Sequence, residues 1–164
     1  MARFLSTVES AAAIVATVPS GANANALFAS IVAGANQGFK LRRMTLGVRA
    51  GASAPTSQQL TVALVRTTAR GTATTTNAPA ALDPNTASQI TGVDTAWSTV
   101  PTATWTAPYL YEVSFNSQSG VDLPFEALEE LVCAKGAANG IALINVGNPL
   151  PASHIYTASV EWEE

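Results

Sequence analysis

The sequence predicts an all-β protein: an antiparallel β-sandwich of the jelly-roll type, with at most one short helix. Apolar and polar residues alternate with a period of two in many short segments, and Gly and Pro residues separate these segments. One domain of 164 residues with many short strands is typical of a sandwich or a barrel. We expect this single domain over residues 21–164, preceded by residues 1–20 as an N-terminal arm or a first strand.

The first apolar run along the chain is AAAIVATV, residues 11–18. Its place behind a charged start is similar to that of a secretory signal. However, Glu9 and several hydroxyl side chains precede the run, and the run is short. We therefore expect a buried first strand at this position. No stretch approaches the length of a membrane-spanning helix, so no membrane partner is expected.

Two runs are apolar on both faces, namely residues 26–33 (ALFASIVA) and 140–146 (GIALINV). A strand that is apolar on both faces is typical of the centre of a sheet that is covered on both sides. We therefore predict both runs as central strands.

Residues 39–50 are strand-like, but their apolar pattern changes phase. The apolar residues are odd-numbered at Phe39 and Leu41 and then even-numbered at Met44, Leu46 and Val48. One strand cannot bury both sets on the same face without a bulge. A strand that bends from one sheet to the other accounts for the change of phase. Two short strands with a tight join remain the alternative.

Three segments show the alternation of a strand that is buried on one face only. The segments are residues 59–67 (QLTVALVRT), 109–116 (YLYEVSFN) and 154–163 (HIYTASVEWE). We expect the inward-facing residues to be Leu60, Val62 and Leu64 in the first, Tyr109, Tyr111, Val113 and Phe115 in the second, and Tyr156, Ala158, Val160 and Trp162 in the third. A chain end this regular predicts a last strand that pairs inside a sheet and closes the core.

Helical periodicity is confined to PFEALEEL, residues 124–131, where Pro124 stands at an acceptable first position. We expect one or two helical turns there. Residues 51–57 predict a turn, and residues 76–108 form a long connection that is either functional or contains elements of its own. Trp97 and Trp105 lie in this connection. They pin it to the sandwich, anchor a protein partner, or stack against a sugar ring.

The charges divide the chain into a basic half and an acidic half. Residues 1–82 carry seven Lys and Arg residues against Glu9, whereas residues 83–164 carry Lys135 against ten carboxylates, and the net charge is −3. The basic residues are spread through strand-like sequence, so we expect no nucleic-acid partner. A basic face that meets an acidic face of a neighbouring copy is favoured instead. Charged residues make up only 12% of the chain, which indicates either a surface covered by other chains or a bland surface rich in hydroxyls.

The sequence offers little catalytic chemistry. His154 is the only histidine and Cys133 the only cysteine, so the usual ligands of a transition-metal site are missing. We expect His154 to be solvated at a sheet edge and Cys133 to be buried as a small apolar residue. The clustered glutamates predict solvated faces rather than a pair of carboxylates across a cleft. We therefore expect no enzyme activity, no cofactor and no metal.

Three stretches carry a resemblance to a known class of protein: LRRMTLGVRAG (41–51), LPFEALEELVCAKGAANGIALINVG (123–147) and YTASVEWEE (156–164). Together with the strand pattern, they resemble the small jelly-roll capsid decoration (cement) proteins of tailed bacteriophages. The resemblance implies a non-enzymatic structural protein that binds the outer surface of a phage capsid and stabilises it, commonly as a trimer. The partners would be the major capsid protein and further copies of the chain. The protein would be made in the host cytoplasm and located on the exterior of the virion.

A protein of this kind needs a rigid scaffold and surfaces for its neighbours. Residues 1–10 could form an arm that adds a strand to a neighbour's sheet. The candidate partner-interface residues are Arg3, Phe4, Leu5, Arg42, Arg43, Trp97, Trp105, Glu161 and Glu163. The alternative function is a glycan- or receptor-binding module of a virion fibre or lectin type. Exposed Trp97 and Trp105 would favour that alternative, and buried indoles would count against it.

Overall fold

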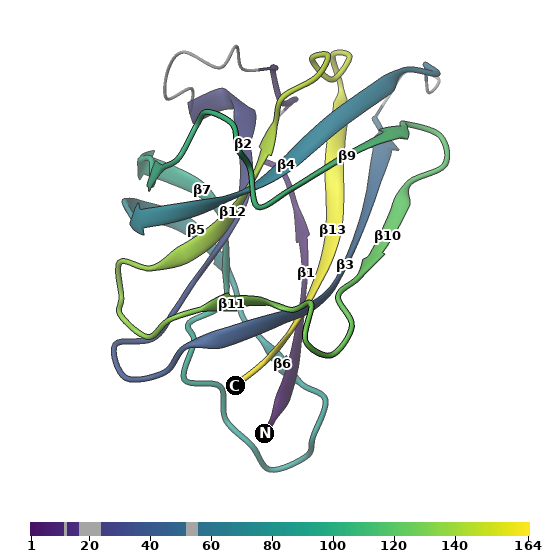
Figure 1. The fold of residues 1–164 in the computed structure, drawn as a ribbon. Coiled ribbons are helices and arrows are strands. Elements are labelled where there is room, and N and C mark those ends of the chain that lie inside the picture. Colours follow the sequence, from purple (N-terminus) through teal and green to yellow (C-terminus); the bar gives the residue numbers. More distant parts are fainter. Residues whose placement is uncertain (12, 17–23, 52–55) are drawn as a thin grey trace.

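Two antiparallel sheets pack face to face in the computed structural model, which describes residues 1–11, 13–16, 24–51 and 56–164 (Figure 1). In sheet A the strand order is β10-β3-β13-β1-β6, and β11 also pairs with β3. Its strands are β1 (Arg3–Glu9), β3 (Phe39–Ala50), β6 (Ala80–Ala81), β10 (Val121–Pro124), β11 (Leu131–Cys133) and β13 (His154–Glu163).

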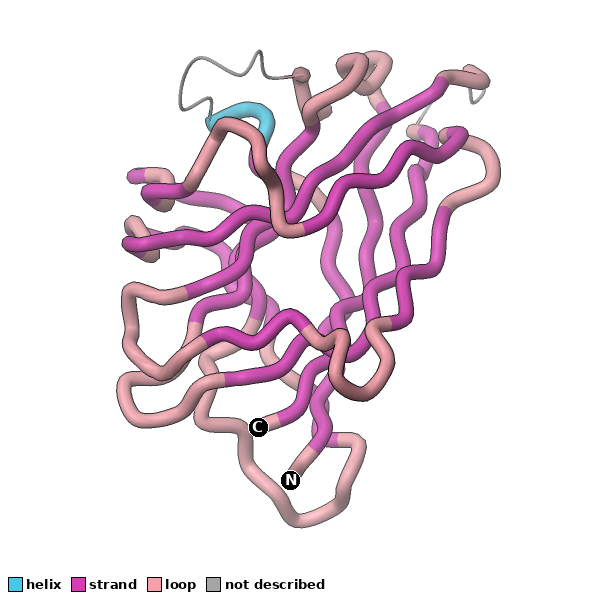
Figure 2. Tube along the Cα trace, viewed as in Figure 1, coloured by secondary structure: helices cyan, strands magenta, loops and turns pink. Residues whose placement is uncertain are grey.

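In sheet B the strand order is β5-β7-β2-β12-β4-β8, and β9 also pairs with β4. Its strands are β2 (Leu27–Val32), β4 (Gln59–Ala69), β5 (Thr72–Asn77), β7 (Val93–Thr99), β8 (Thr102–Ala103), β9 (Tyr111–Asn116) and β12 (Gly140–Asn145). Among the described residues, helix is limited to the 3-10 turn η1 (Ala24–Ala26) (Figure 2). The all-β prediction is confirmed.

The path of the chain between the sheets is that of a jelly roll. Strands β1, β3, β10 and β13 lie in sheet A, and β2, β4, β9 and β12 lie in sheet B. The chain changes sheet at every step along these eight strands except between β4 and β9, which pair with each other. This is the eight-stranded double Greek-key arrangement. Strands β5 to β8 are additions between β4 and β9. Strands β6, β7 and β8 lie within the predicted long connection, residues 76–108, whereas β5 begins before it.

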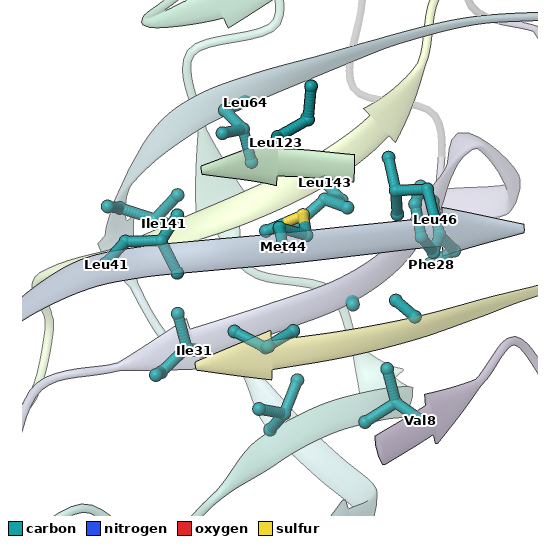
Figure 3. Packing of buried hydrophobic residues seen from close by; sticks show 14 of the residues in the cluster. Val8, Phe28, Ile31, Leu41, Met44, Leu46, Leu64, Leu123, Ile141 and Leu143 are labelled. Carbon is teal, nitrogen blue, oxygen red and sulfur yellow. The ribbon is translucent and has the colours of Figure 1, made fainter. Parts of the chain in front are cut away.

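The inner faces of both sheets form the main core, which Figure 3 shows from close by. Phe28 of β2 stacks on Tyr156 of β13 with ring centroids 4.4 Å apart, and Phe4 of β1 stacks on Trp162 of β13 at 6.0 Å. Tyr156, Ala158, Val160 and Trp162 are all buried. The last strand therefore closes the core as predicted, because it lies between β1 and β3 in the middle of sheet A.

The change of phase in β3 corresponds to a bulge. Glu161 of β13 pairs with Arg43, but the next residue, Trp162, pairs with Leu41, so Arg42 is the extra residue of β3. Phe39 and Leu41 on one side of the bulge and Met44 and Leu46 on the other all reach the core. The predicted bend from one sheet to the other was wrong, because the whole of β3 stays in sheet A.

Three other local predictions were wrong. Residues 13–16 are not a strand, although Ile14 is buried and its carbonyl accepts a hydrogen bond from Leu150 N; residues 12, 17 and 18 of the same prediction lie outside the described residues. Residues 124–131 contain turns between β10 and β11 instead of helix, because β-pairing with β3 takes both flanks. Tyr111, predicted to face the core, is 42% exposed, and its ring meets Phe125 edge-on with ring centroids 5.7 Å apart.

His154 is also not where the sequence placed it. The side chain is 1% exposed, and His154 pairs with Ala50 of β3 at the start of β13. Its Nδ1 lies 3.1 Å from the carbonyl oxygen of Ala152. Cys133 is buried as predicted, and burial raises the pKa of its thiol.

Candidate functional site: the outer face of sheet A

The outer face of sheet A collects polar side chains because each of its central strands alternates between core and surface. On β13, Thr157, Ser159, Glu161 and Glu163 stand between the buried residues. On β1, Leu5, Thr7 and Glu9 do the same, and on β3 Arg43, Thr45 and Gly47 do so beyond the bulge. Six of the nine predicted interface residues meet on this face: Arg3, Leu5, Arg42, Arg43, Glu161 and Glu163.

The charged groups of this face bind one another within the chain. Arg3 pairs with Glu161, and Arg42 pairs with Glu130 and, at 3.4 Å, with Glu163. We expected from the sequence that these carboxylates would meet basic residues of a neighbouring copy. Instead, antiparallel pairing of β1 and β3 with β13 brings the partners together in one molecule.

Two further ion pairs have bidentate geometry. Arg43 donates from Nε and Nη2 to the two carboxylate oxygens of Asp122, at 2.8 and 2.6 Å. These hydrogen bonds from Arg43 lower the pKa of the Asp122 carboxyl. Arg49 donates in the same way to Glu9, at 3.2 and 3.0 Å. The face is therefore charged but largely neutralised.

A hollow of about 930 Å³ lies on this face and is lined mainly by hydroxyl side chains. Its lining includes Thr7 of β1, Thr45 and Gly47 of β3, Thr157 and Ser159 of β13, and Thr75, Asn77 and Thr95 from β5 and β7. Glu9 is the one charged residue of the lining among the described residues, and Arg49 neutralises it. The hollow can donate and accept many hydrogen bonds, and among its described lining residues the one carboxylate, Glu9, is bound to Arg49.

The geometry of the hollow depends on a glycine and on a strand edge. A Cβ atom at Gly47 would approach Thr157 Oγ1 to 3.2 Å, which is closer than an ordinary contact. The absence of a side chain at Gly47 therefore leaves space above β3 for the hollow. Asn77 donates to the carbonyl oxygen of Thr7 at 2.9 Å and accepts from Ser6 Oγ at its own carbonyl oxygen, at 3.2 Å. These bonds fix the end of β5 beside the edge of β1.

The remaining predicted interface residues lie elsewhere. Phe4 points into the core, so its side chain is not available to a partner. Trp105 is buried against the outer face of sheet B, in a second cluster with Ala26, Leu27, Ala63, Val65, Ala142 and Ile144. Trp97 is half-buried against the same cluster. The long connection thus folds over sheet B, and the indoles pin it there.

A buried ion pair was missed by sequence reasoning. Asp94 of β7 is 1% exposed, and Arg70 binds its two carboxylate oxygens from Nε and Nη2, both at 2.8 Å. Thr76 of β5 donates a third hydrogen bond to Asp94 at 2.5 Å. The hydroxyl-lined hollow was also missed. Its only sequence signal was the run of Thr residues in TATTTN. The hollow itself depends on which strands become neighbours, and the sequence pattern does not show this.

Within the described residues, no group of three or more His, Cys, Asp and Glu side chains is arranged to hold a metal ion. None of the helices in that part of the chain is long and apolar enough to cross a membrane. In comparisons with known proteins, no family model, no curated protein and no solved structure matches this chain.

Proposed function

We propose that the protein is a non-enzymatic decoration protein that binds the outer surface of a phage capsid and stabilises it, assembling as a trimer. The outer face of sheet A is the docking surface in this proposal. The sequence resemblance supplies the class of partner, and the outer face of sheet A supplies a surface suited to it.

The observation that carries the proposal is the neutral, hydroxyl-lined hollow between intrachain ion pairs. The cores of protein interfaces are depleted in charged residues, because an unpaired charge is costly to remove from water. Here the charges that a partner would cover already have partners in the chain. The hydroxyl groups remain to bond with a neighbour, and β1, β3 and β13, the three long strands of sheet A, keep most of them in place.

The test uses empty shells assembled from the major capsid protein encoded in the same genome. Wild-type protein should co-sediment with the shells and raise the temperature at which they disrupt. Thr157→Arg fills the floor of the hollow beside Gly47 and should abolish binding. Thr99→Arg, on an exposed position of β7 in the other sheet, is the matched control and should bind like wild type. Failure of wild-type protein to bind, or normal binding by Thr157→Arg, would contradict the proposal.

The hollow also favours a second candidate, a glycan-binding module. Neutral sugars are recognised by hydroxyl and amide groups of the kind that line this surface. Burial of Trp105 counts against a site in which a sugar ring stacks on both Trp97 and Trp105. A glycan array separates the two candidates: specific sugar binding that Thr157→Arg removes, without binding to shells, would favour the glycan module.

A further inference from the structure

One loop presents an apolar side chain to solvent between two carboxylates. Leu128, in the turn between β10 and β11, is 98% exposed, and Glu126 and Glu129 flank it. Its φ angle is +76°, a left-handed conformation that a bulky residue adopts only when its surroundings impose it. Packing within the chain does not explain why a leucine stands in a strained conformation at this exposed position.

The loop is held in this conformation by specific contacts. Glu129 N donates to the carbonyl oxygen of Glu126 at 3.0 Å, and Leu128 N donates to Glu130 Oε2 at 2.9 Å. Glu130 in turn pairs with Arg42, the bulge residue of β3. Leu128 is therefore part of a braced projection, and a braced projection loses little conformational freedom when it binds.

The Leu128 loop projects and carries carboxylates, whereas a recess bordered by cations lies along β11, the next strand. Hollows of about 460 and 270 Å³ share the lining residues Val132, Cys133 and Ala134. Val132 is 51% exposed between them. β11 pairs with β3 on one side only, so it is an edge strand of sheet A among the described residues. The recess thus lies at a sheet edge, and its larger hollow is mainly apolar whereas its smaller one is about half polar.

The Lys and Arg residues around this recess are those that form no ion pair among the described residues. Five of the eight Lys and Arg residues form ion pairs within the chain: Arg3, Arg42, Arg43, Arg49 and Arg70. In the described residues the other three are Lys40 and Lys135, which line the larger hollow, and Arg66, which lines the smaller one. Arg66 also donates to the carbonyl oxygen of Val132 at 2.5 Å.

Two carboxylates also border the larger hollow, and both are engaged elsewhere. Glu163 pairs with Arg42 at 3.4 Å. Glu164 accepts hydrogen bonds from Trp162 Nε1 at 3.0 Å and from Gln89 N at 2.8 Å. The amines of Lys40 and Lys135 are therefore the groups best placed to meet a carboxylate from outside.

We propose that the occupant of the recess is the Leu128 loop of a second copy of this chain. Leu128 would lie against Val132 of the other copy, and Glu126 and Glu129 would face Lys40, Lys135 and Arg66. Each molecule carries both halves of this contact, and Leu128 does not fill its own recess because it is almost fully exposed. Such a contact forms a two-fold pair where two copies exchange loops, and repeated head to tail it forms a ring if the rotation closes and a filament if it does not. A ring of three gives the trimer, so the contact rests in part on the proposed function.

The first test measures self-association of the full chain in solution, without shells, by light scattering over a range of concentrations. Wild-type protein should form a closed oligomer. Leu128→Gly should weaken association at least about tenfold while keeping or raising the melting temperature, because glycine adopts the left-handed conformation without strain. Leu82→Ser removes another exposed apolar side chain and should associate like wild type. A monomeric wild type, or unchanged association of Leu128→Gly, would overturn the contact.

A charge exchange tests the polar part of the contact. Glu129→Lys and Lys135→Glu should each weaken association, and the double variant should recover it, because the two charges again differ in sign across the interface. Glu112→Lys, on an exposed position of β9, is the control with the same charge change. If the double variant associates no better than either single variant, these charges do not meet. Thr157→Arg should associate normally, so failure of this contact is distinguishable from failure of shell binding.

Discussion

At the scale of single residues, the core contains polar atoms whose partners are not evident. Among the described residues, Tyr156 Oη and His154 Nε2 are buried without a hydrogen-bond partner. Both side chains point inward from β13, where the alternation of the strand places them. A buried polar atom without a partner costs about 1–3 kcal/mol. Tyr156 offsets this cost through its ring, which stacks on Phe28 and also contacts Phe115.

Tyr156→Phe keeps the ring and removes the hydroxyl, so it should raise the free energy of unfolding by about 1 kcal/mol or more near pH 8. The pH dependence has a definite sign. Burial raises the pKa of Tyr156 above its ordinary value, whereas tyrosine in the unfolded chain ionises near about pH 10.

Below about pH 10, Tyr156 is protonated in both the folded and the unfolded chain, so its ionisation does not change the free energy of unfolding. Above about pH 10 the unfolded chain ionises first, and the wild-type free energy of unfolding falls by about 1.4 kcal/mol for each pH unit. Denaturant titrations at pH 8 and pH 11 should therefore show the advantage of the variant growing with pH. A variant that is less stable than wild type at pH 8 would show that the hydroxyl has a bonding partner.

At the scale of elements, the sequence predicted the features that depend on the periodicity of a strand. It missed the features that depend on which strands lie next to one another in the sheets. The phase change in β3 predicted an interruption of the regular strand, because an unbroken period of two cannot place Leu41 and Met44 in one core. The predicted bend between sheets was wrong, and the interruption is a bulge within sheet A. The apolar pattern of PFEALEEL fitted helix locally, but pairing of both flanks with β3 overrode it. His154 was misplaced because its sequence neighbours are those of a loop, whereas in the structure it begins β13 and pairs with Ala50 of β3.

The same distinction applies to the candidate site. Alternation on β13 predicted that Glu161 and Glu163 would face away from the core. It could not predict that Arg3 and Arg42 would bind them, because this depends on strand order. The hollow on sheet A and the covering of sheet B by Trp105 likewise follow from tertiary arrangement.

The bulge gives a prediction at this scale. Deletion of Arg42 restores a strict period of two to β3 and should turn Phe39 and Leu41 away from the core. Burial of each side chain contributes about 1.5–3 kcal/mol, so the deletion should lower the free energy of unfolding by about 3–6 kcal/mol. Arg42→Ala keeps the bulge and removes part-buried ion pairs with Glu130 and Glu163, which should cost less, about 1–3 kcal/mol. Equal losses in chemical denaturation would mean that the extra residue does not set the register.

At the scale of the whole molecule, the division into a basic and an acidic half has a structural explanation. In a jelly roll the first strands of the chain pair with the last, and β13 lies between β1 and β3. Arginines of the first half therefore meet carboxylates of the second at Glu161, Glu130, Glu163, Asp122 and Asp94. Pairing within one molecule therefore accounts for much of the charge asymmetry, and Lys40, Lys135 and Arg66 are the cations outside these ion pairs in the described residues.

These pairs differ in what they contribute, because burial differs. Asp94 is enclosed where the β4–β5 connection meets β7, whereas Asp122 lies at the surface. Removing one partner of a buried pair costs about 3–5 kcal/mol, since the other charge stays buried alone. Arg70→Ala should therefore lower the free energy of unfolding by about that amount, and Arg43→Ala, its surface counterpart, by about 0–1 kcal/mol.

Replacing both buried partners tests the reason for this difference. If the cost of Arg70→Ala arises from the uncompensated charge of Asp94, then Arg70→Met combined with Asp94→Leu should recover most of the lost stability, because no buried charge remains. Denaturant unfolding of the three variants and wild type measures each step. A double variant as unstable as Arg70→Ala would mean that the Asp94 hydrogen bonds to Arg70 and Thr76 themselves hold β5 and β7 to the sandwich. In that case the ion pair would be a structural requirement of the added strands and not a replaceable charge pair.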